Sequence, residues 1–192
     1  MTLQYYEDNA EQFAQNTLDV DMSELYERFL AHLPPTSRIL DAGCGAGRDA
    51  ATFIQLGYQV DAFDASPKLV KIAKEVSGIP VQLSTFLNFS SEHSYAGIWA
   101  CASLLHVPTV SLSATLKHLG ELLEPKGVMY VSFKYGEDES VRSGRHFTNC
   151  TEARLEQFLE NTGLHTKEVW ISTDRRPDRD DEQWLNALLT LA

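Results

Sequence analysis

One stretch decides the fold: Ile39-Leu40-Asp41-Ala42-Gly43-Cys44-Gly45-Ala46-Gly47-Arg48-Asp49. A short apolar strand leads into a turn with glycine at alternate positions, and a helical pattern follows. Glycine adopts positive φ without strain and lets a ligand approach the backbone closely. The helix start behind the turn offers unpaired N–H groups and partial positive charge. The stretch therefore predicts a strand, a ligand-binding turn and a helix.

Strands and helices alternate outward from this stretch. Apolar periodicity predicts two helices before it, over 6–16 and 21–33, and the prolines at 34 and 35 end the second. Later helices are expected over 48–56, 66–76, 108–124 and 151–163, and strands over 38–42, 58–64, 80–83, 97–102, 128–133, 165–173 and 184–191. This alternation predicts an α/β fold, a doubly wound parallel sheet with helices on both faces. The link 174–183 is too short for a crossover helix, so the last strand is expected to be antiparallel.

The overall charge limits the possible partners. The 192 residues contain 16 Lys and Arg against 27 Asp and Glu, a formal net charge of −11. Attraction to phosphates supplies most non-specific affinity for nucleic acids and anionic membranes, so this charge argues against both. The acidic N-terminus is unlike a signal peptide, and the longest apolar run, 96–105, is too short for a membrane span. We expect a cytoplasmic protein that is a monomer or a homodimer.

The cysteines and histidines do not predict a metal site. Cys44, Cys101 and Cys150 are far apart and form no C-x-x-C pair, which argues against a disulfide framework and a zinc ribbon. The histidines also lack the spacing of metal ligands, so we expect no metal.

An acidic residue narrows the ligand to a nucleoside. Asp64 follows Gly43 by 21 residues, at the end of the second strand, where a carboxylate can accept both ribose hydroxyls. A dinucleotide fingerprint would need a small residue where Arg48 stands, which argues against a nicotinamide-dependent oxidoreductase. The pattern from Asp41 to Gly47 is instead D-x-G-x-G-x-G.

This pattern resembles the first motif of class I S-adenosylmethionine-dependent methyltransferases. The resemblance continues through the segments 64–67, 99–106 and 123–127, and the Tyr5-Tyr6 start is similar to the lid helix of small members. Within the superfamily the chain looks most like the compact tellurite-resistance-type enzymes. The resemblance implies one Rossmann-like domain over 1–192, with a helical lid over 1–35 and a core over 36–192. It also implies seven strands in the order 3-2-1-4-5-7-6 with strand 7 antiparallel, and S-adenosyl-L-homocysteine as a product.

The resemblance also implies which residues contact the cofactor. The methionine part is assigned to Asp41, Gly43, Cys44 and Gly45, with Arg48 near its carboxylate. The ribose is assigned to Asp64, the adenine to Ala65, Ser66, Thr85 and Phe86, and the sulfonium side to Cys101 and Ala102. Related enzymes carry an acidic or polar adenine contact after strand three; Ser84-Thr85-Phe86 has no acid there, so Thr85 is the candidate.

The acceptor side is predicted from cations and from two possible proton-transfer groups. Arginine forks bind anionic oxygens well, which favours a small anionic acceptor such as a thiol, a chalcogen oxyanion or a metabolite. A hydroxyl acceptor would also need a base within about 3 Å, whereas a thiolate would not. His106 and Tyr6 are the candidate catalytic residues, and the candidate substrate-binding residues are Tyr5, Lys134, Arg142, Arg145, Arg175, Arg176 and Arg179.

Several alternatives remain open at this point. The late arginines could instead pair with Asp174, Asp178, Asp180 and Asp181 in a solvated loop, His106 could be structural, and Tyr6 could simply anchor the first helix. The acceptor could be RNA or a protein, and the chain could be a non-catalytic protein that senses S-adenosylmethionine or supports a partner.

Overall fold

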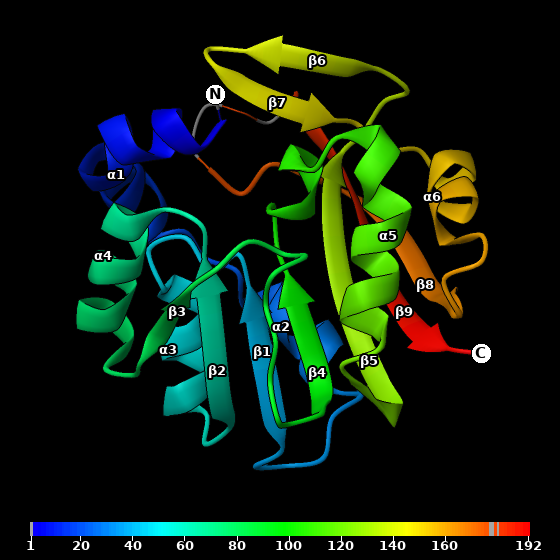
Figure 1. Cartoon of the computed structure of the whole chain (residues 1–192), viewed down its shortest axis with the longest axis horizontal. Coiled ribbons are helices and arrows are strands. Elements are labelled where there is room, and N and C mark those ends of the chain that lie inside the picture. Colours follow the sequence, from blue (N-terminus) through cyan, green and yellow to red (C-terminus); the bar gives the residue numbers. More distant parts are fainter. Residues whose placement is uncertain (1, 177–178, 180) are drawn as a thin grey trace.

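A seven-stranded sheet forms the centre of the protein (Figure 1). The computed structural model describes residues 2–176, 179 and 181–192. The sheet runs β3-β2-β1-β4-β5-β9-β8, and β9 is antiparallel to both neighbours, so the predicted order and antiparallel last strand are confirmed. Its strands are β1 (Arg38–Ala42), β2 (Gln59–Asp64), β3 (Val81–Leu83), β4 (Tyr95–Ala100), β5 (Leu123–Lys134), β8 (Leu164–Thr173) and β9 (Gln183–Leu191).

Helices cover both faces of this sheet. Figure 1 shows α5 in front of it and α2 behind it. Successive strand residues point to opposite faces, so Leu40 and Ile98 belong to the core under α5, while Ile39 and Trp99 belong to the core under α2. The helices are α1 (Thr2–Thr17), α2 (Ser23–Leu30), α3 (Arg48–Gln55), α4 (Pro67–Ser77), α5 (Thr109–Gly120) and α6 (Glu152–Leu159), with a 3₁₀ turn η1 (Leu104–His106).

Helix α1 lies across the carboxyl ends of the strands (Figure 1). Its backbone is broken at Asn9, with φ −121° and ψ 17°, where the Asn9 side chain donates to the carbonyl of Tyr5 at 2.8 Å. An asparagine side chain that bonds to nearby backbone competes with the helical pattern. The break separates residues 2–8 from the part of α1 that buries Ala10 and Ala14.

Helix α2 differs from the expected lid over 1–35. It buries Leu25, Tyr26 and Phe29 against the rear face of the sheet and is therefore part of the core. Of the two N-terminal helices, α1 is the one that lies over the carboxyl ends of the strands.

The boundary between α5 and β5 differs from the prediction. The helix was expected to reach residue 124, but it ends at Gly120 and the strand begins at Leu123. Tyr95 pairs with Leu123 and Gly97 pairs with Val128, so the segment 124–127 forms a bulge within the strand ladder. Pro125 donates no ladder hydrogen bond, which a bulge tolerates. Pro125 therefore lies within the strand and does not mark the end of the helix.

A two-stranded hairpin, β6 (Glu139–Arg142) and β7 (Arg145–Thr148), stands where the sequence predicts only a loop. Its two turn residues, Ser143 and Gly144, have φ of 49° and 75°, as a two-residue type I′ turn requires. The Ser-Gly pair was the available sequence signal. Figure 1 shows the hairpin lying over the carboxyl ends of the strands, close to α1.

Candidate active site

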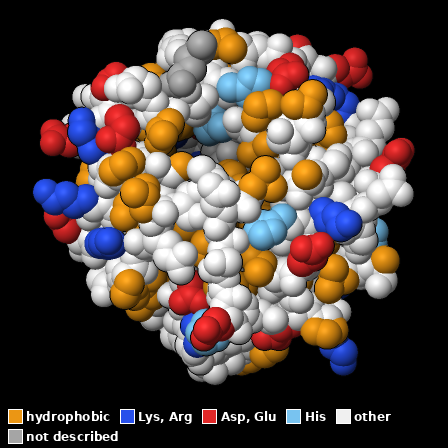
Figure 2. Space-filling view, viewed as in Figure 1, with side chains coloured by type: hydrophobic (Ala, Val, Ile, Leu, Met, Phe, Trp, Pro, Cys, Tyr) orange, Lys and Arg blue, Asp and Glu red, His pale blue; other side chains and the backbone are white. Residues whose placement is uncertain are grey.

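A cavity of about 570 Å³ opens at the carboxyl ends of the strands, where a doubly wound sheet holds its ligands. Its walls come from the turn after β1, the end of β2, the segment 84–87, η1, the first turns of α1, β7 and the β8–β9 connection. Figure 2, viewed from the α5 side, shows a hollow in the upper part of the molecule with histidine side chains at its edge.

The glycine turn brings bare backbone to the cavity wall. Gly43 has φ +74°, and a Cβ there would lie 2.7 Å from the Ser103 Cβ; at Gly45, with φ +55°, it would lie 3.1 Å from the Phe13 ring. The hydroxyl of Ser103 donates to the carbonyl of Ala42 at 2.8 Å and fixes the turn from below. Both glycines line the cavity, so a ligand can approach their backbone directly.

Gly47 differs from the other two glycines, because its missing side chain allows α3 to pack closely against α4. Its φ is +85°, and a Cβ would lie 2.9 Å from the Ala73 Cα. We expect Gly47→Ala to lower the free energy of unfolding by roughly 2–4 kcal/mol, combining left-handed strain with overpacking. The matched variant Gly57→Ala has φ +92° and no described atom within 4 Å of its Cβ, so it should cost only the strain. Urea denaturation measures both, and equal losses would contradict the steric contribution.

Asp64 projects from the end of β2 into the cavity. One carboxylate oxygen accepts from the N–H of Gly45 and the other from the N–H of Ser66, both at 2.9 Å. Burial raises the pKa of Asp64, and these backbone donors oppose the rise. Each oxygen has further lone-pair capacity and the residue lines the cavity, so the carboxylate can also accept two ligand hydroxyls.

Asp41 does not line the cavity. It is buried beneath the turn, where it accepts from the N–H of Ala50 at 3.0 Å and connects β1 to α3. Burial and the nearby Asp49 raise its pKa well above the ordinary value. The structure therefore places Asp41 under the ligand-binding turn rather than at its surface.

Arg48 lines the cavity, but its charge is paired. Its Nε donates to Asp49 at 2.6 Å, its Nη2 donates to the other Asp49 oxygen at 3.1 Å, and its Nη1 donates to the carbonyl of Thr17 at 3.0 Å. Asp49 also accepts from the Tyr26 hydroxyl at 2.5 Å and the Trp99 indole at 2.8 Å. Burial alone would raise the pKa of Asp49, but Arg48 holds it below its usual value. No sequence pattern indicates this buried network, because Tyr26 and Trp99 are distant from Asp49 along the chain.

The adenine-side candidates are also assembled at the cavity. Ala65, Ser66, Thr85 and Phe86 line it. The Phe86 ring lies edge-on to Phe63 with centroids 5.4 Å apart, which makes an apolar wall.

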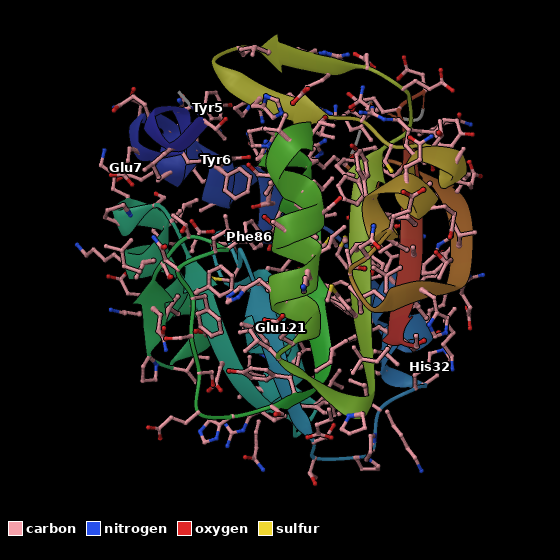
Figure 3. The ribbon with its side chains drawn as sticks, turned by 45° about the vertical axis from the view of Figure 1, so that its right-hand side comes forward. Tyr5, Tyr6, Glu7, His32, Phe86 and Glu121 are labelled. Carbon is pink, nitrogen blue, oxygen red and sulfur yellow. The ribbon has the colours of Figure 1, made fainter. Side chains whose placement is uncertain are left out.

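Glu7 connects α1 to this wall. Its carboxylate accepts from the Ser66 hydroxyl and, at 3.1 Å, from the N–H of Lys68, and Lys68 Nζ donates to its carbonyl at 2.6 Å. In Figure 3, Glu7 points from α1 toward α4, whereas Tyr6 points toward α5.

Residues that follow β4 form part of the cavity floor, together with Cys44 from the turn after β1. Cys44, Cys101 and Ala102 all line it. Burial raises the pKa of Cys101 to about 12, so its thiol stays protonated. The N–H of Ala102 donates to the Ser132 hydroxyl at 2.8 Å, which joins this floor to β5.

Tyr6 and His106 form a hydrogen-bonded pair at the cavity. The Tyr6 oxygen lies 2.7 Å from His106 Nε2, and His106 Nδ1 lies 2.7 Å from the carbonyl of His146. A carbonyl only accepts, so Nδ1 carries the proton, Nε2 is the acceptor and the Tyr6 hydroxyl donates to it. Burial lowers the pKa of His106 to about 4, helped by Arg145, His146 and Lys134, so the imidazole is neutral at pH 7. Burial raises the pKa of Tyr6, and Arg145 opposes that rise.

Most of the predicted cations are paired with carboxylates of this chain. Arg175 pairs with Glu24, Arg176 with Asp174, and both Lys134 and Arg179 with Glu182. These four cations line the cavity, and the pair of Arg176 with Asp174 is the alternative left open by the sequence. Asp178 and Asp180, named in the same alternative, lie outside the described residues. Arg142 is exposed, pairs with Asp138 and lies away from the cavity.

Arg145 differs from the other cations. Its guanidinium lies 4.3 Å from the Tyr5 ring centroid and 5.2 Å from that of Phe147, and it lines the cavity. Its Nε is buried with no hydrogen-bond partner in the described part of the chain. Tyr5 itself does not line the cavity, but it supports Arg145 from outside. The backbone N–H of His146 donates to the Thr2 hydroxyl at 2.9 Å, which holds the hairpin against α1.

Among the described residues, no helix is both long and apolar enough to cross a bilayer. The described residues also contain no cluster of three or more histidine, cysteine, aspartate or glutamate side chains that could hold a metal ion.

Comparison with known proteins identifies the family. Residues 14–169 match the methyltransferase domain family. The chain belongs to this family. A ubiquinone biosynthesis O-methyltransferase from Xanthomonas axonopodis pv. citri is 32% identical to the methyltransferase over 182 residues, covering 79% of this chain and 75% of that protein. The methyltransferase is therefore an enzyme of the class that the glycine motif predicted.

Solved structures show the same fold. A TehB-like S-adenosylmethionine-dependent methyltransferase from Corynebacterium glutamicum has a TM-score of 0.77 at 20% identity, covering 96% of this chain and 99% of that one. A 1,6-didemethyltoxoflavin-N1-methyltransferase from Burkholderia thailandensis, solved with S-adenosylhomocysteine, has a TM-score of 0.76 at 21% identity, covering 98% and 85%. Together with the family model, these structures confirm the predicted membership of the S-adenosylmethionine-dependent methyltransferase superfamily, whose cofactor is S-adenosylmethionine.

The cavity of the methyltransferase fits this cofactor. Side chains at Gly43 and Gly45 would collide with Ser103 and Phe13, so the turn is held close to the cavity by bare backbone. Asp64 presents a carboxylate for two hydroxyls, and Phe86 offers an apolar wall for a flat base. These residues therefore fit the nucleoside part of the cofactor.

Proposed function

We propose that the enzyme transfers a methyl group from S-adenosylmethionine to a small anionic acceptor bound beside Arg145. The observation that carries the proposal is the buried, unpartnered Nε of Arg145 at the cavity, since the other cavity-lining cations of the late loops have carboxylate partners. A guanidinium whose Nε is unpartnered, and which has no carboxylate partner among the described residues, favours an anionic oxygen. The names of the O-methyltransferase relative and of the N1-methyltransferase neighbour, solved with its small ligand, support a small acceptor.

The residues divide the cavity into two functional halves. Asp64 would hold the ribose hydroxyls, the Gly43–Gly45 turn the methionine part, and Thr85 with Phe86 the adenine. When bound, S-adenosylmethionine supplies an electrophilic methyl group. Tyr6, His106 and Arg145 would face the acceptor and exclude water from it, because α1 and β7 cover this half.

A labelling experiment tests the acceptor class. The enzyme is incubated with methyl-labelled cofactor and a cell extract separated into small molecules and macromolecules. We expect label in anionic small molecules, and we expect Arg145→Gln to reduce transfer at least 30-fold, about 2 kcal/mol, the value of a hydrogen bond to a charged group. S-adenosylhomocysteine affinity should be unchanged in a calorimeter.

The matched control is Arg142→Gln, on the neighbouring strand of the same hairpin but outside the cavity. It should transfer at the wild-type rate. Label that appears only in macromolecules, or an Arg145→Gln enzyme with full transfer, would contradict a small anionic acceptor.

A further inference from the structure

We propose that Tyr6 and His106 form a proton relay, and that the acceptor is therefore an aromatic hydroxyl compound with a second, anionic group at Arg145. This inference rests on the proposed function and names its substrate class. A thiolate or a preformed oxyanion would need no proton acceptor, whereas a phenolic hydroxyl would.

The hydrogen-bond directions favour a relay. The carbonyl of His146 fixes the proton on Nδ1 of His106, so Nε2 accepts from the Tyr6 hydroxyl. The Tyr6 oxygen keeps its own accepting capacity, and its residue lines the cavity. A hydroxyl that donates to Tyr6 would thus extend one continuous chain of donors from the cavity to the imidazole. Figure 3 shows the Tyr6 ring reaching from α1 toward α5, above Phe86.

The charges around His106 explain why the anionic group matters. The groups that face it are Tyr6 from α1, Arg145 and His146 from β7, and Lys134 from β5. Lys134 is paired with Glu182, but Arg145 has no carboxylate partner in the described part of the chain. An acceptor anion at Arg145 would offset this positive charge and raise the pKa of His106 from about 4. The substrate would then strengthen the base that receives its proton.

Aromatic side chains favour a flat acceptor. Phe13, Phe147 and Trp184 line the cavity together with Tyr6. Rings pack favourably edge-to-face or offset against other rings. The wall around the relay therefore suits an aromatic ring that carries the hydroxyl and the anionic group.

Proton transfer and methyl transfer are coupled in the proposed step. The acceptor hydroxyl gives its proton to the Tyr6 oxygen while Tyr6 gives its own proton to His106 Nε2. The acceptor oxygen forms the new bond to the methyl carbon, the carbon–sulfur bond breaks, and its electron pair stays on sulfur. Tyr6 ends neutral and His106 ends as an imidazolium, whose proton is returned to solvent when the site opens.

The test uses two matched sets of probes, the meta and para hydroxybenzoates and the meta and para mercaptobenzoates. Each pair differs by one atom, and at pH 8 the phenols are largely protonated while the aryl thiols are largely ionised. We expect wild-type enzyme to methylate at least one hydroxybenzoate on its hydroxyl oxygen. Tyr6→Phe should lower kcat for that probe about 100-fold, the lower range for lost acid–base catalysis. Transfer to the matching mercaptobenzoate should change less than 3-fold.

Two further variants separate proton transfer from structure. His106→Gln can still accept a hydrogen bond from Tyr6 but cannot take up a proton. We expect its rate, like that of Tyr6→Phe, to rise tenfold per pH unit between 7 and 9, as the phenol ionises unaided. The wild-type rate should be nearly flat over this range. Tyr135→Phe removes a hydroxyl that bonds to Glu152 outside the cavity and should behave as wild type.

A readout independent of turnover is the NMR titration of the His106 imidazole. Adding the accepted hydroxybenzoate to wild-type enzyme should raise the pKa of His106, and the Arg145→Gln enzyme should show a smaller rise. The relay is overturned if Tyr6→Phe slows oxygen and sulfur transfer equally, if only thiols accept the methyl group, or if no hydroxybenzoate does. Failure of the proposed function is distinct, because it would appear as no labelled anionic small molecule from the extract.

Discussion

Replacement of Asp49 by asparagine is expected to lower the free energy of unfolding by about 3–5 kcal/mol, the usual cost of breaking a buried ion pair. Asp49 is buried and accepts from the Arg48 guanidinium, the Tyr26 hydroxyl and the Trp99 indole. The variant would leave Arg48 as a buried charge with no carboxylate at bonding distance. It would also leave one donor of the network facing an amide N–H₂ group. Urea denaturation followed by tryptophan fluorescence measures the loss.

The comparison variant is Arg142→Gln, which breaks the exposed pair with Asp138 and leaves the hydrogen bond from Asn149 to Asp138 in place. The side chains of Asp138 and Arg142 are 55% and 57% exposed, against 9% and 19% for Asp49 and Arg48. An exposed pair contributes roughly 0–1 kcal/mol, so this variant should remain close to wild type. A small loss from Asp49→Asn would mean that water enters the site and solvates Arg48.

Replacement of Asp64 by alanine should weaken the binding of S-adenosylhomocysteine by at least 100-fold. The proposed ribose contacts are two hydrogen bonds to a charged acceptor, each worth roughly 1.5–3 kcal/mol. The variant would also leave the N–H groups of Gly45 and Ser66 without their partner, which would loosen the glycine turn. Calorimetric titration gives the affinity directly and does not depend on the acceptor.

Asp61→Ala is the control for this measurement. Asp61 stands on the same strand, but it bonds to Arg38 and Tyr95 and does not line the cavity. The affinity of the Asp61→Ala enzyme for S-adenosylhomocysteine should stay within 3-fold of the wild-type value. If the Asp64→Ala enzyme bound S-adenosylhomocysteine with normal affinity, Asp64 would not be part of the cofactor site.

The cofactor half of the cavity could be predicted from sequence because its signals are local. The turn from Asp41 to Gly47, the acid at the end of β2 and the cap at Ser66 each lie within a few residues of the element that they define. Ser66 caps α4, since its hydroxyl accepts from the N–H of Leu69 at 3.2 Å. The role of Asp41 was harder to judge, because no sequence pattern says whether a carboxylate faces the ligand or lies beneath the turn.

The acceptor half depends on contacts between distant residues. Tyr6 and His106 are 100 positions apart, and Arg175 and Glu24 are 151 apart, so sequence alone could name the candidates but not their partners. Arg142 and Arg145 are directly paired across the β6–β7 hairpin, yet only Arg145 lines the cavity. Their difference could not be foreseen while the hairpin itself was expected to be a loop.

The first two turns of α1 have a consequence for the kinetics of the enzyme. Glu7 bonds to the start of α4 on the cofactor side, and the adjacent Tyr6 bonds to His106 on the acceptor side. The backbone break at Asn9 separates these residues from the anchored remainder of the helix. Moving residues 2–8 about Asn9 would therefore release both halves of the cavity at once. We expect both products to depart with a common rate, set by this segment and sensitive to solvent viscosity.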